Sequence, residues 1–306
     1  MDWLLVLGGL GVGVVVGLTG MGGGALMTPM LVIFFGIDPV TAVSSDLVVS
    51  LIMKPFGAGV HAKEGTVNYS LVKWLCIGSV PAAFAGVFLL NALGGDDVSQ
   101  LVKKYLGYAL LLAATSMVVR HEINRKRGTH VAAEGAQLSI TVKPLPTLLI
   151  GIVGGLIVGM TSVGSGSLII VLLLLLYPSV AAGQLVGTDL VQAVPLVGAA
   201  ALGHLLYGDV EFSLAGSLLI GAIPGVLIGA RISSRAADHV IRPILVVVLL
   251  APGAKLLDAP NELILGFLGL ALLVGLAASA RSMVRGARAA RSDRPHGEAA
   301  PEQAPA

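Results

Sequence analysis

The chain has 306 residues, of which 56% are hydrophobic and only 12% charged, and its mean hydropathy is +0.93. Soluble domains carry about twice that charged fraction, so this composition excludes a cytosolic globular protein and predicts an integral membrane protein. The formal net charge is only +2, but no Lys or Arg occurs in positions 144–230. A charged side chain in the bilayer core costs several kcal/mol, so this stretch should hold mostly membrane-spanning segments.

The basic residues of positions 281–294 follow the last apolar segment. A basic stripe can bind nucleic acid, but beside a membrane segment it is more typical of the cytoplasmic surface, and we expect no nucleic-acid partner. The single cysteine, Cys76, lies in an apolar run, which excludes disulfides and cysteine-based metal sites within one chain. No removable signal peptide is expected, because no positive region precedes the first apolar stretch.

The chain contains two related halves. The sequence GLTGMGGG at 17–24 recurs 142 positions later as GMTSVGSG at 159–166, and the match continues with one inserted residue. The later matches pair Asp46 with Asp189, His61 with His204, Pro81 with Pro224, and glycines 65, 78 and 86 with glycines 208, 221 and 229. Because Asp, His and Pro align as well as Gly, we expect two homologous transmembrane repeats, 1–122 and 145–258, joined by a cytoplasmic loop at 123–144.

Each repeat is predicted to hold a broken opening segment and three spanning helices. Glycine clusters at 20–24 and 162–166 interrupt the opening segments, and the pieces that follow, 24–36 and 167–177, reach only about 17–20 Å as helices. These pieces are too short to cross a core of about 30 Å. The full-length candidates are 40–60, 70–90, 101–119, 182–205, 212–232 and 239–256. We expect an additional transmembrane helix at 259–280 and a disordered cytoplasmic tail at 281–306.

The distribution of positive charge indicates how the opening segments cross the membrane. If each forms a re-entrant hairpin or a pair of short helices, the basic residues near 125–127, 231–242 and 281–294 share the cytoplasmic side, and the N-terminus and the acidic loop 209–211 lie outside. A hairpin plus three spans is an odd number of transits, so the repeats should have inverted topologies. Lys103 and Lys104, on the outer side, fit this topology less well. Inverted repeats with interrupted helices are typical of alternating-access transporters, which bind substrate near the midplane.

The two glycine motifs are candidate anion-binding elements. Their glycines free backbone N–H groups from helical hydrogen bonding, and free N–H groups at helix N-termini bind anions. Close helix packing through small residues is the alternative; we favour binding, because packing does not explain a break that occurs in both halves. The substrate-binding residues expected from these motifs are Thr19, Met21, Gly22, Gly23, Gly24, Thr161, Ser162, Gly164, Ser165 and Gly166.

Charged residues within the predicted spans supply further candidates. Asp46 and Asp189 are equivalent and follow Ser45 and Thr188; an intramembrane carboxylate is a functional candidate, and capping of the following helix is the alternative. Lys54 has no counterpart, since position 197 is Val, and it either provides the counter-charge of an anion or snorkels to the cytoplasmic interface. We include Ser45, Lys54 and Thr188 among the substrate-binding candidates.

His61 and His204 lie near the ends of the same predicted spans. Together with Asp46 and Asp189 they are candidates for proton coupling; the alternative for the histidines is a position facing the membrane interface. Each Asp and its His are 15 residues apart, about 22 Å along one helix. The four cannot share one ion unless the halves converge, so we expect no metal, and no cofactor is predicted.

Taken together, these motifs resemble the TauE/SafE family of bacterial sulfite and sulfonate exporters. The resemblance covers about residues 5–258 and rests on the duplicated glycine break, the Ser-Asp and Thr-Asp pairs, and the HxxxG sequences that begin at His61 and His204. It implies a multi-pass transporter of the bacterial inner membrane that carries a sulfur-containing anion such as sulfite, thiosulfate or an organosulfonate. Ser165 departs from the family's glycine run, so the two half-sites should be unequal.

The expected function is secondary transport of this anion by alternating access, with protons as candidate coupling ions and the lipid bilayer as surroundings. The residues alone indicate only a small anionic solute; the sulfur chemistry is implied by the resemblance. A passive anion channel, or a transporter of an unrelated small organic anion, is the alternative. We expect no enzyme, because no catalytic motif with suitable local spacing occurs.

Overall fold

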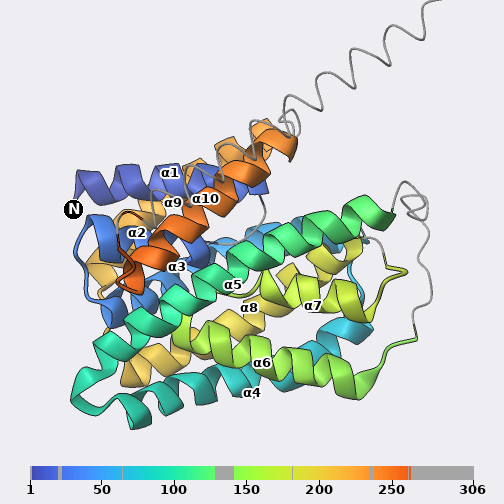
Figure 1. Ribbon diagram of the computed structural model, residues 1–306, viewed down its shortest axis with the longest axis horizontal. Helices are drawn as coiled ribbons and strands as arrows, with labels where there is room; N and C mark the ends of the chain where they lie inside the picture. The colour runs from blue at the N-terminus through green and yellow to red at the C-terminus, as the bar shows by residue number, and fades with distance from the viewer. Residues whose placement is uncertain are drawn as a thin grey trace, which may run out of the picture.

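The computed structural model is a bundle of helices (Figure 1). It describes residues 2–19, 23–63, 65–127, 141–180, 182–233 and 238–260, together with Glu262. Within these residues the chain forms ten α-helices, one short 3-10 helix and no strand. The predicted all-α class is therefore confirmed.

The helices occur in the same order in the two halves. The first half contains α1 (Trp3–Thr19), α2 (Gly24–Phe34), α3 (Pro39–Lys63), α4 (Tyr69–Gly94), the 3-10 helix η1 (Gly95–Asp97) and α5 (Val98–Arg127). The second half contains α6 (Pro144–Thr161), α7 (Leu168–Leu176), α8 (Ala182–Tyr207), α9 (Phe212–Ser233) and α10 (Asp238–Leu256). In both halves the interruption falls at the glycine motif, and a short helix follows it.

Within the described residues, six helices are long and apolar enough to cross a membrane: Pro39–Lys63, Tyr69–Leu93, Val98–Val119, Pro144–Thr161, Gln184–Tyr207 and Phe212–Gly229. Five of them coincide with predicted spans. The sixth is α6, which the sequence suggested only as one arm of a broken segment, and whose 18 residues suffice for a span. Its counterpart α1 is one residue shorter. The predicted span 239–256 lies in α10. Helix α5 continues to Arg127, beyond position 122, where the first repeat was predicted to end. Positions 263–306 lie outside the described residues.

Local sequence explains where the breaks occur. Pro144 starts α6, where a missing N–H is tolerated. Ser162 ends α6 in the left-handed conformation, with φ 59°, and its N–H donates to the carbonyl of Val158. Gly164 and Gly166 also have positive φ, 137° and 87°. A left-handed Ser followed by two such glycines cannot continue a helix, so α7 must begin anew.

Long contacts join the two halves. Helix α1 packs along α9, α6 packs along α4, and α3 crosses α8 at the centre. Small residues let these backbones approach closely: a β-carbon on Gly13 would lie 2.5 Å from the carbonyl oxygen of Ala222, and one on Gly155 would overlap Ser79. Gly13 and Gly155 therefore serve close helix packing, whereas the glycines of the motifs that follow them lie at the helix breaks.

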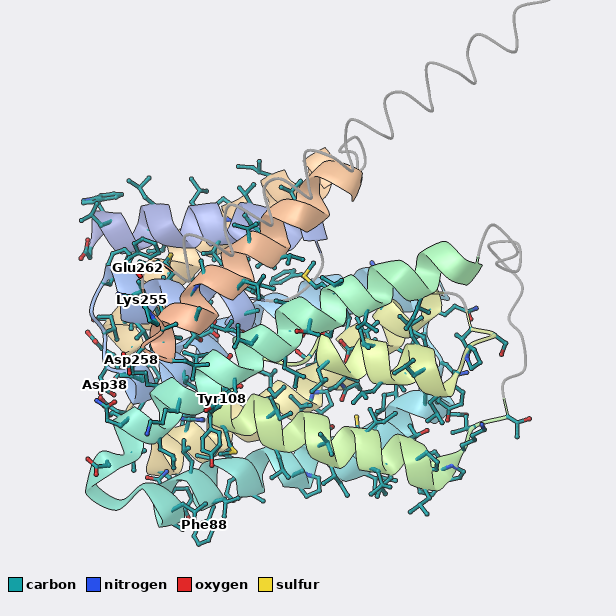
Figure 2. The ribbon with its side chains drawn as sticks, viewed as in Figure 1. Asp38, Phe88, Tyr108, Lys255, Asp258 and Glu262 are labelled. Carbon is teal, nitrogen blue, oxygen red and sulfur yellow. The ribbon has the colours of Figure 1, made fainter. Side chains whose placement is uncertain are left out.

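Equivalent helices of the two halves run in opposite directions (Figure 1). Helices α1 and α5 run away from the end of the molecule where the N-terminus lies, whereas α6 and α10 run toward it. Asp38, Lys255 and Asp258 lie at that end (Figure 2). Helix α5 ends at the opposite end of the molecule (Figure 1).

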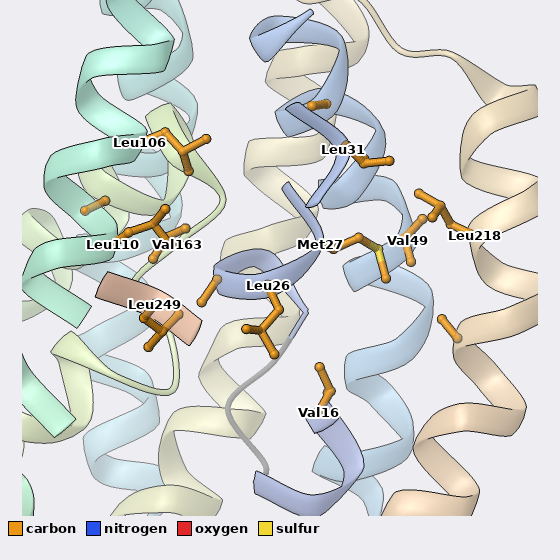
Figure 3. Close-up of a cluster of buried hydrophobic side chains, with 14 of the residues drawn as sticks. Val16, Leu26, Met27, Leu31, Val49, Leu106, Leu110, Val163, Leu218 and Leu249 are labelled. Carbon is orange, nitrogen blue, oxygen red and sulfur yellow. The ribbon is translucent and has the colours of Figure 1, made fainter. Parts of the chain in front are cut away.

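The short helices lie inside the bundle, each in its own apolar cluster. Met27 and Leu31 of α2 are fully buried among residues of α3, α5, α9 and α10 (Figure 3). Ile169 and Leu173 of α7 are fully buried among residues of α3, α4, α6 and α8. The described residues of the breaks, Gly23 and 162–167, are also buried by protein, as interrupted helices at membrane depth require.

Candidate functional site

The two helix breaks meet in the interior. Gly24 is the first residue of α2 and lies against Ser162, which ends α6: a β-carbon on Gly24 would overlap the carbonyl oxygen of Ser162 and lie 2.7 Å from its Oγ. Val163, next along the second break, is buried near Leu106 and Leu110 of α5 (Figure 3). The two broken segments are therefore in direct contact inside the bundle.

Three buried polar side chains of α3 face this junction at one-turn spacing: Asp46, Ser50 and Lys54. Asp46 Oδ2 accepts hydrogen bonds from Thr28 Oγ1 at 2.9 Å and from Ser162 Oγ at 2.6 Å. Because α3 begins at Pro39, Asp46 lies beyond the first turn, and the alternative that it caps this helix is wrong.

Asp46 Oδ1 and Ser50 Oγ are buried and have no hydrogen-bond partner among the described residues. Both oxygens lie 3.5 Å from the position that a β-carbon on Gly23 would occupy. An unpaired buried oxygen is costly, and two of them side by side at a helix break mark a place where a ligand or a proton can bind.

Lys54 reaches the second break. Its ammonium donates a hydrogen bond to Ser165 Oγ, and it interacts electrostatically with both Asp46 and Asp189. The side chain of Lys54 is only 8% exposed, so the alternative that it snorkels to the interface is wrong. One buried cation thus lies between two buried carboxylates, where α3 and α8 cross the two breaks.

Asp189 is bound differently from Asp46. Its Oδ2 accepts the backbone N–H of Gly166 at 2.6 Å, and its Oδ1 accepts Gln192 Nε2 at 2.9 Å. Gln192 Oε1 in turn accepts Ser79 Oγ at 3.1 Å. The N–H group that the second break frees at Gly166 is therefore satisfied by an internal carboxylate, although the sequence suggested that it binds the substrate anion.

The two histidines also differ. His204 is 1% exposed; its Nε2 donates to the carbonyl of Gly159 at 2.8 Å, and Ser44 Oγ lies 2.7 Å from its Nδ1. A carbonyl can only accept, so Nε2 carries a proton and His204 joins α8, α6 and α3. His61 is half-buried, and its Nδ1 lies 3.0 Å from Thr66 Oγ1. The interface-facing alternative is therefore wrong for His204.

Ser45 and Thr188 point away from the breaks. Ser45 Oγ accepts the N–H of Glu211 at 3.1 Å, and Thr188 Oγ1 accepts the N–H of Asn68 at 3.0 Å. These bonds hold the α8–α9 and α3–α4 connections. Thr161 Oγ1 donates within its own helix, to the carbonyl of Ile157.

The remaining predicted residues divide between the junction and the undescribed part of the chain. The structure brings together Gly23, Gly24, Asp46, Lys54, Ser162, Ser165, Gly166 and Asp189. Gly164 lies in the same break, beside Val158. The side chain of Thr19 and residues Met21 and Gly22 lie outside the described residues. Among the described residues, no group of three or more His, Cys, Asp or Glu is placed to hold a metal ion.

Sequence reasoning missed four polar residues at the junction: Thr28, Ser50, Ser79 and Gln192. Two of them carry a readable signal. Ser50 follows Asp46 by four residues and Gln192 follows Asp189 by three, which are the spacings that place side chains on one helix face. Thr28 and Ser79 are on other helices, and no local pattern connects them to either carboxylate.

Comparison with known proteins identifies the family. Residues 5–256 match the family model described as sulfite exporter TauE/SafE. The chain is 41% identical over 259 residues to the probable membrane transporter protein YjnA of Bacillus subtilis, covering 84% of this chain and 100% of that protein. It is 24% identical to the probable membrane transporter protein YunE of the same organism, covering 83% and 96% of the two chains.

The chain is also 27% identical over 252 residues to the probable membrane transporter protein MJ0441 of Methanocaldococcus jannaschii, covering 78% of this chain and 89% of that protein. No solved structure matches the chain. The family match covers both halves and both helix breaks, and the relatives are named as membrane transporters. The chain therefore belongs to the TauE/SafE sulfite exporter family and is a multi-pass membrane transporter.

Proposed function

We propose that this protein is a secondary transporter that moves a small sulfur-containing anion across the bacterial inner membrane by alternating access, coupled to protons. The observation that carries the proposal is the buried ammonium of Lys54, held where the two helix breaks meet. A buried cation in a membrane protein is costly unless it is paired or has a function. Here it is an attractive centre for an anion at the junction.

The donors around Lys54 suit an oxyanion. An ammonium group has three donors, and hydroxyl groups can donate to anionic oxygens. Lys54 already bonds to Ser165, and the Ser162 hydroxyl lies on the other side of the junction, on Asp46. Sulfite, thiosulfate and sulfonates each present several oxygens on one sulfur, so one such anion can accept from Lys54 and from a serine together. The family description supplies the sulfite class.

An inverted repeat is the arrangement that we propose for the two halves. Contacts exchange between them: α1 packs along α9 while α6, the equivalent of α1, packs along α4, the equivalent of α9. The hydrogen bonds exchange too, since Ser45 bonds to Glu211 and Thr188 to Asn68, each pair displaced by 143 positions from the other. The opposite helix directions in Figure 1 support a two-fold axis in the membrane plane. Rocking of one half against the other would then expose the junction to either side.

Counterflow in proteoliposomes tests the proposed transport. Vesicles loaded with unlabelled sulfite, thiosulfate or an alkylsulfonate should accelerate uptake of the matching ³⁵S-labelled anion, because a carrier exchanges substrate across the membrane. A passive channel gives no such acceleration. Absence of counterflow for all three anions by well-folded protein would overturn the proposal.

Gly23→Val and Gly59→Val form a matched pair for this assay. A side chain at position 23 would fill the space beside Asp46 Oδ1 and Ser50 Oγ, so counterflow should fall sharply. A β-carbon at position 59 meets nothing within 4 Å, so that variant should transport normally. Normal transport by a well-expressed Gly23→Val variant would assign Gly23 to packing only.

Sidedness tests the inverted repeat. In a Cys76→Ala background, Lys126→Cys at the end of α5 should react with an impermeant thiol reagent from the cytoplasm. Asp209→Cys, in the α8–α9 connection, should react from outside. Labelling of both positions from one side would contradict the proposed topology.

A further inference from the structure

We propose that the coupling proton binds to Oδ1 of Asp46, and that Asp189 is a positioning residue that holds the second helix break. The inference rests on the proposed transport function and goes beyond it, by assigning the coupling step to one of four candidate groups. Among the described residues, Asp46 is the only one of these four with a buried oxygen or nitrogen left unpaired in the structure.

Asp46 is arranged so that it can gain a proton without breaking a bond. Its Oδ2 keeps the donors Thr28 and Ser162, and Oδ1 has no hydrogen-bond partner among the described residues. Ser50, one turn further along α3, lies beside Asp46, and its hydroxyl can donate to the ionised carboxylate and accept from the protonated one. The proton comes from water on one side of the membrane and is returned to water on the other side, so no further reactant is needed.

Asp189 lacks this arrangement. Both of its oxygens accept from N–H donors, of Gly166 and of Gln192, and a proton on either oxygen would face one of these donors. The position equivalent to Ser50 is Ala193, which offers no acceptor. Asp189 is therefore suited to fix the backbone of the second break, where its bond to Gly166 satisfies a freed N–H.

The histidines are not suited to the coupling step either. Both ring nitrogens of His204 are engaged, by Gly159 and Ser44, and a second ring proton would require the Ser44 hydroxyl to turn away. His61 contacts Thr66 and lies beside Gly187, near the α3–α4 connection and away from the junction. Neither histidine has an unpaired polar atom of the kind found at Asp46.

The charged groups around Asp46 explain how a proton would control anion binding. Lys54 lies on the same helix, and Asp189 of α8 also acts on Lys54. His204 of α8 is engaged by Ser44, while α2 and the apolar part of α9, Phe212–Gly229, contain no titratable side chain. On α5, Lys103 and Lys104 lie near the start of the helix, and Lys103 pairs with Asp258.

With Asp46 ionised, one ammonium faces two carboxylates, and the junction carries one net negative charge that repels an anion. A proton on Asp46 makes the junction neutral and leaves Lys54 able to attract the anion. Binding of one proton should therefore accompany binding of one monoanion. A metal cation is a poorer occupant, because hard cations take about six oxygen ligands and the described residues offer two unpaired oxygens beside Gly23.

Infrared difference spectroscopy tests the proton site without any substrate. On a pH titration of the purified protein, a slowly deuterium-exchanging carboxylic acid band should appear in the wild type and in Asp189→Asn, and should be missing from Asp46→Asn. Ser50→Ala should shift the frequency of this band, whereas Ala193→Ser should not. A band that persists in Asp46→Asn, or that disappears in folded Asp189→Asn, would overturn the assignment.

Flux in proteoliposomes provides the functional test, with ³⁵S-thiosulfate and ³⁵S-sulfite as probes. Asp46→Asn should lose pH-gradient-driven uptake by about tenfold or more, and should lose counterflow at equal pH by a clearly smaller factor, because exchange requires no change of protonation. Asp189→Asn, whose amide oxygen can still accept from Gly166, should keep the response to pH. Ser50→Ala should move the pH of half-maximal uptake by about half to one unit.

The opposite pattern, coupling kept in Asp46→Asn or lost only in Asp189→Asn, would overturn the inference. Uptake driven by a sodium gradient and not by a pH gradient would overturn it as well. If the wild type shows no counterflow with either anion, the transport proposal fails, and the infrared experiment still decides whether Asp46 binds the proton.

Discussion

The half-sites around Asp46 and Asp189 occupy equivalent places in two related halves. Of the two aspartates, only Asp189 has hydrogen-bond partners among the described residues for both carboxylate oxygens. Asp189 accepts from a backbone N–H of its own helix break and from Gln192. Asp46 accepts from two hydroxyls, and its other oxygen, beside Gly23, has no partner in the part of the chain that the structure describes. The helix is broken in both halves, but among the described residues only the first half has a buried carboxylate oxygen without a partner.

The replacements that separate the half-sites are few and specific. Position 50 is Ser and its equivalent is Ala193; position 54 is Lys and its equivalent is Val197. Gln192 takes the place equivalent to Val49. An acceptor and a cation therefore occur on α3 only, and an additional donor occurs on α8 only. The comparison teaches that repeat symmetry describes the backbone, whereas the chemistry depends on the departures from it.

The largest effect is expected where the two half-sites touch. Gly24→Ala would force a β-carbon into the carbonyl of Ser162, so we expect a loss of about 3 kcal/mol or more of stability. Gly166→Ala, with φ 87° in the other half, should cost about 1–2 kcal/mol from backbone strain. Thermal unfolding in detergent measures both. Gly11→Ala, where a β-carbon meets nothing within 4 Å, is the neutral control.

Removal of the shared cation should affect both carboxylates. Lys54→Met leaves Asp46 and Asp189 without their counter-charge, and breaking a buried pair in this way costs about 3–5 kcal/mol. The double variant Lys54→Met/Asp46→Asn should recover part of that stability, though not transport. Thermal melts together with counterflow assays separate the two effects, and a Lys54→Met variant as stable as the wild type would contradict the placement of Lys54.

Replacement of the two histidines should also cost unequal amounts of stability. His204→Ala orphans the carbonyl of Gly159 and the hydroxyl of Ser44 and should cost about 2–4 kcal/mol. His61→Ala removes one contact, with Thr66, at a half-buried position and should cost about 1 kcal/mol. Melting of the two variants under identical conditions makes the comparison. Equal losses would contradict the three-helix connection assigned to His204.

In contrast, the hydrogen bonds of Ser45 and Thr188 with the loops of the other half should contribute equally to stability. Ser45→Ala and Thr188→Val each remove an acceptor for a loop N–H, of Glu211 and Asn68 respectively. Each should cost about 1 kcal/mol, and the double variant should show nearly additive losses because the two sites share no partner. Unfolding midpoints of the single and double variants test this, and clearly unequal losses would limit the symmetry to the helices.

The smallest effect is expected at an exposed aspartate, in contrast to the two buried ones. Asp258 pairs with Lys103 at 2.8 Å, and this ammonium lowers the pKa of the carboxyl. Because this pKa is lowered, the ionised carboxyl stabilises the fold at pH values above the ordinary pKa of 3.8. That stabilisation is lost as the pH falls through the lowered pKa. Asp258→Asn should therefore melt slightly below the wild type at neutral pH, and the difference should vanish in strong acid and in high salt. A difference that persists under those conditions would point to another role.

Much of the fold follows from the sequence by local physics. Apolar runs of sufficient length must be helical in a bilayer, because every backbone polar group needs an internal partner. The glycine clusters at 20–24 and 162–166 predicted the two breaks, and the helices before them end at Thr19 and Thr161, whereas the glycines at 8–13 lie inside α1. The offset of 142–143 positions aligned the halves, and single intramembrane charges identified Asp46 and Lys54 as residues of interest.

The tertiary structure decided which of these residues act together. Ser45 and Asp46 are neighbours in the chain, but a helix turns about 100° per residue, so Asp46 meets the breaks while Ser45 meets the loop before α9. Which helix lies on each face cannot be read from one helix alone. Asp189 binds Gly166, and Asp46 has one oxygen without a partner among the described residues. Both facts depend on contacts between separate elements, and the contact of Asp46 with Ser162 joins residues more than a hundred positions apart. Local sequence sets the backbone of each half, and only the packing of the halves determines which polar groups remain free to bind.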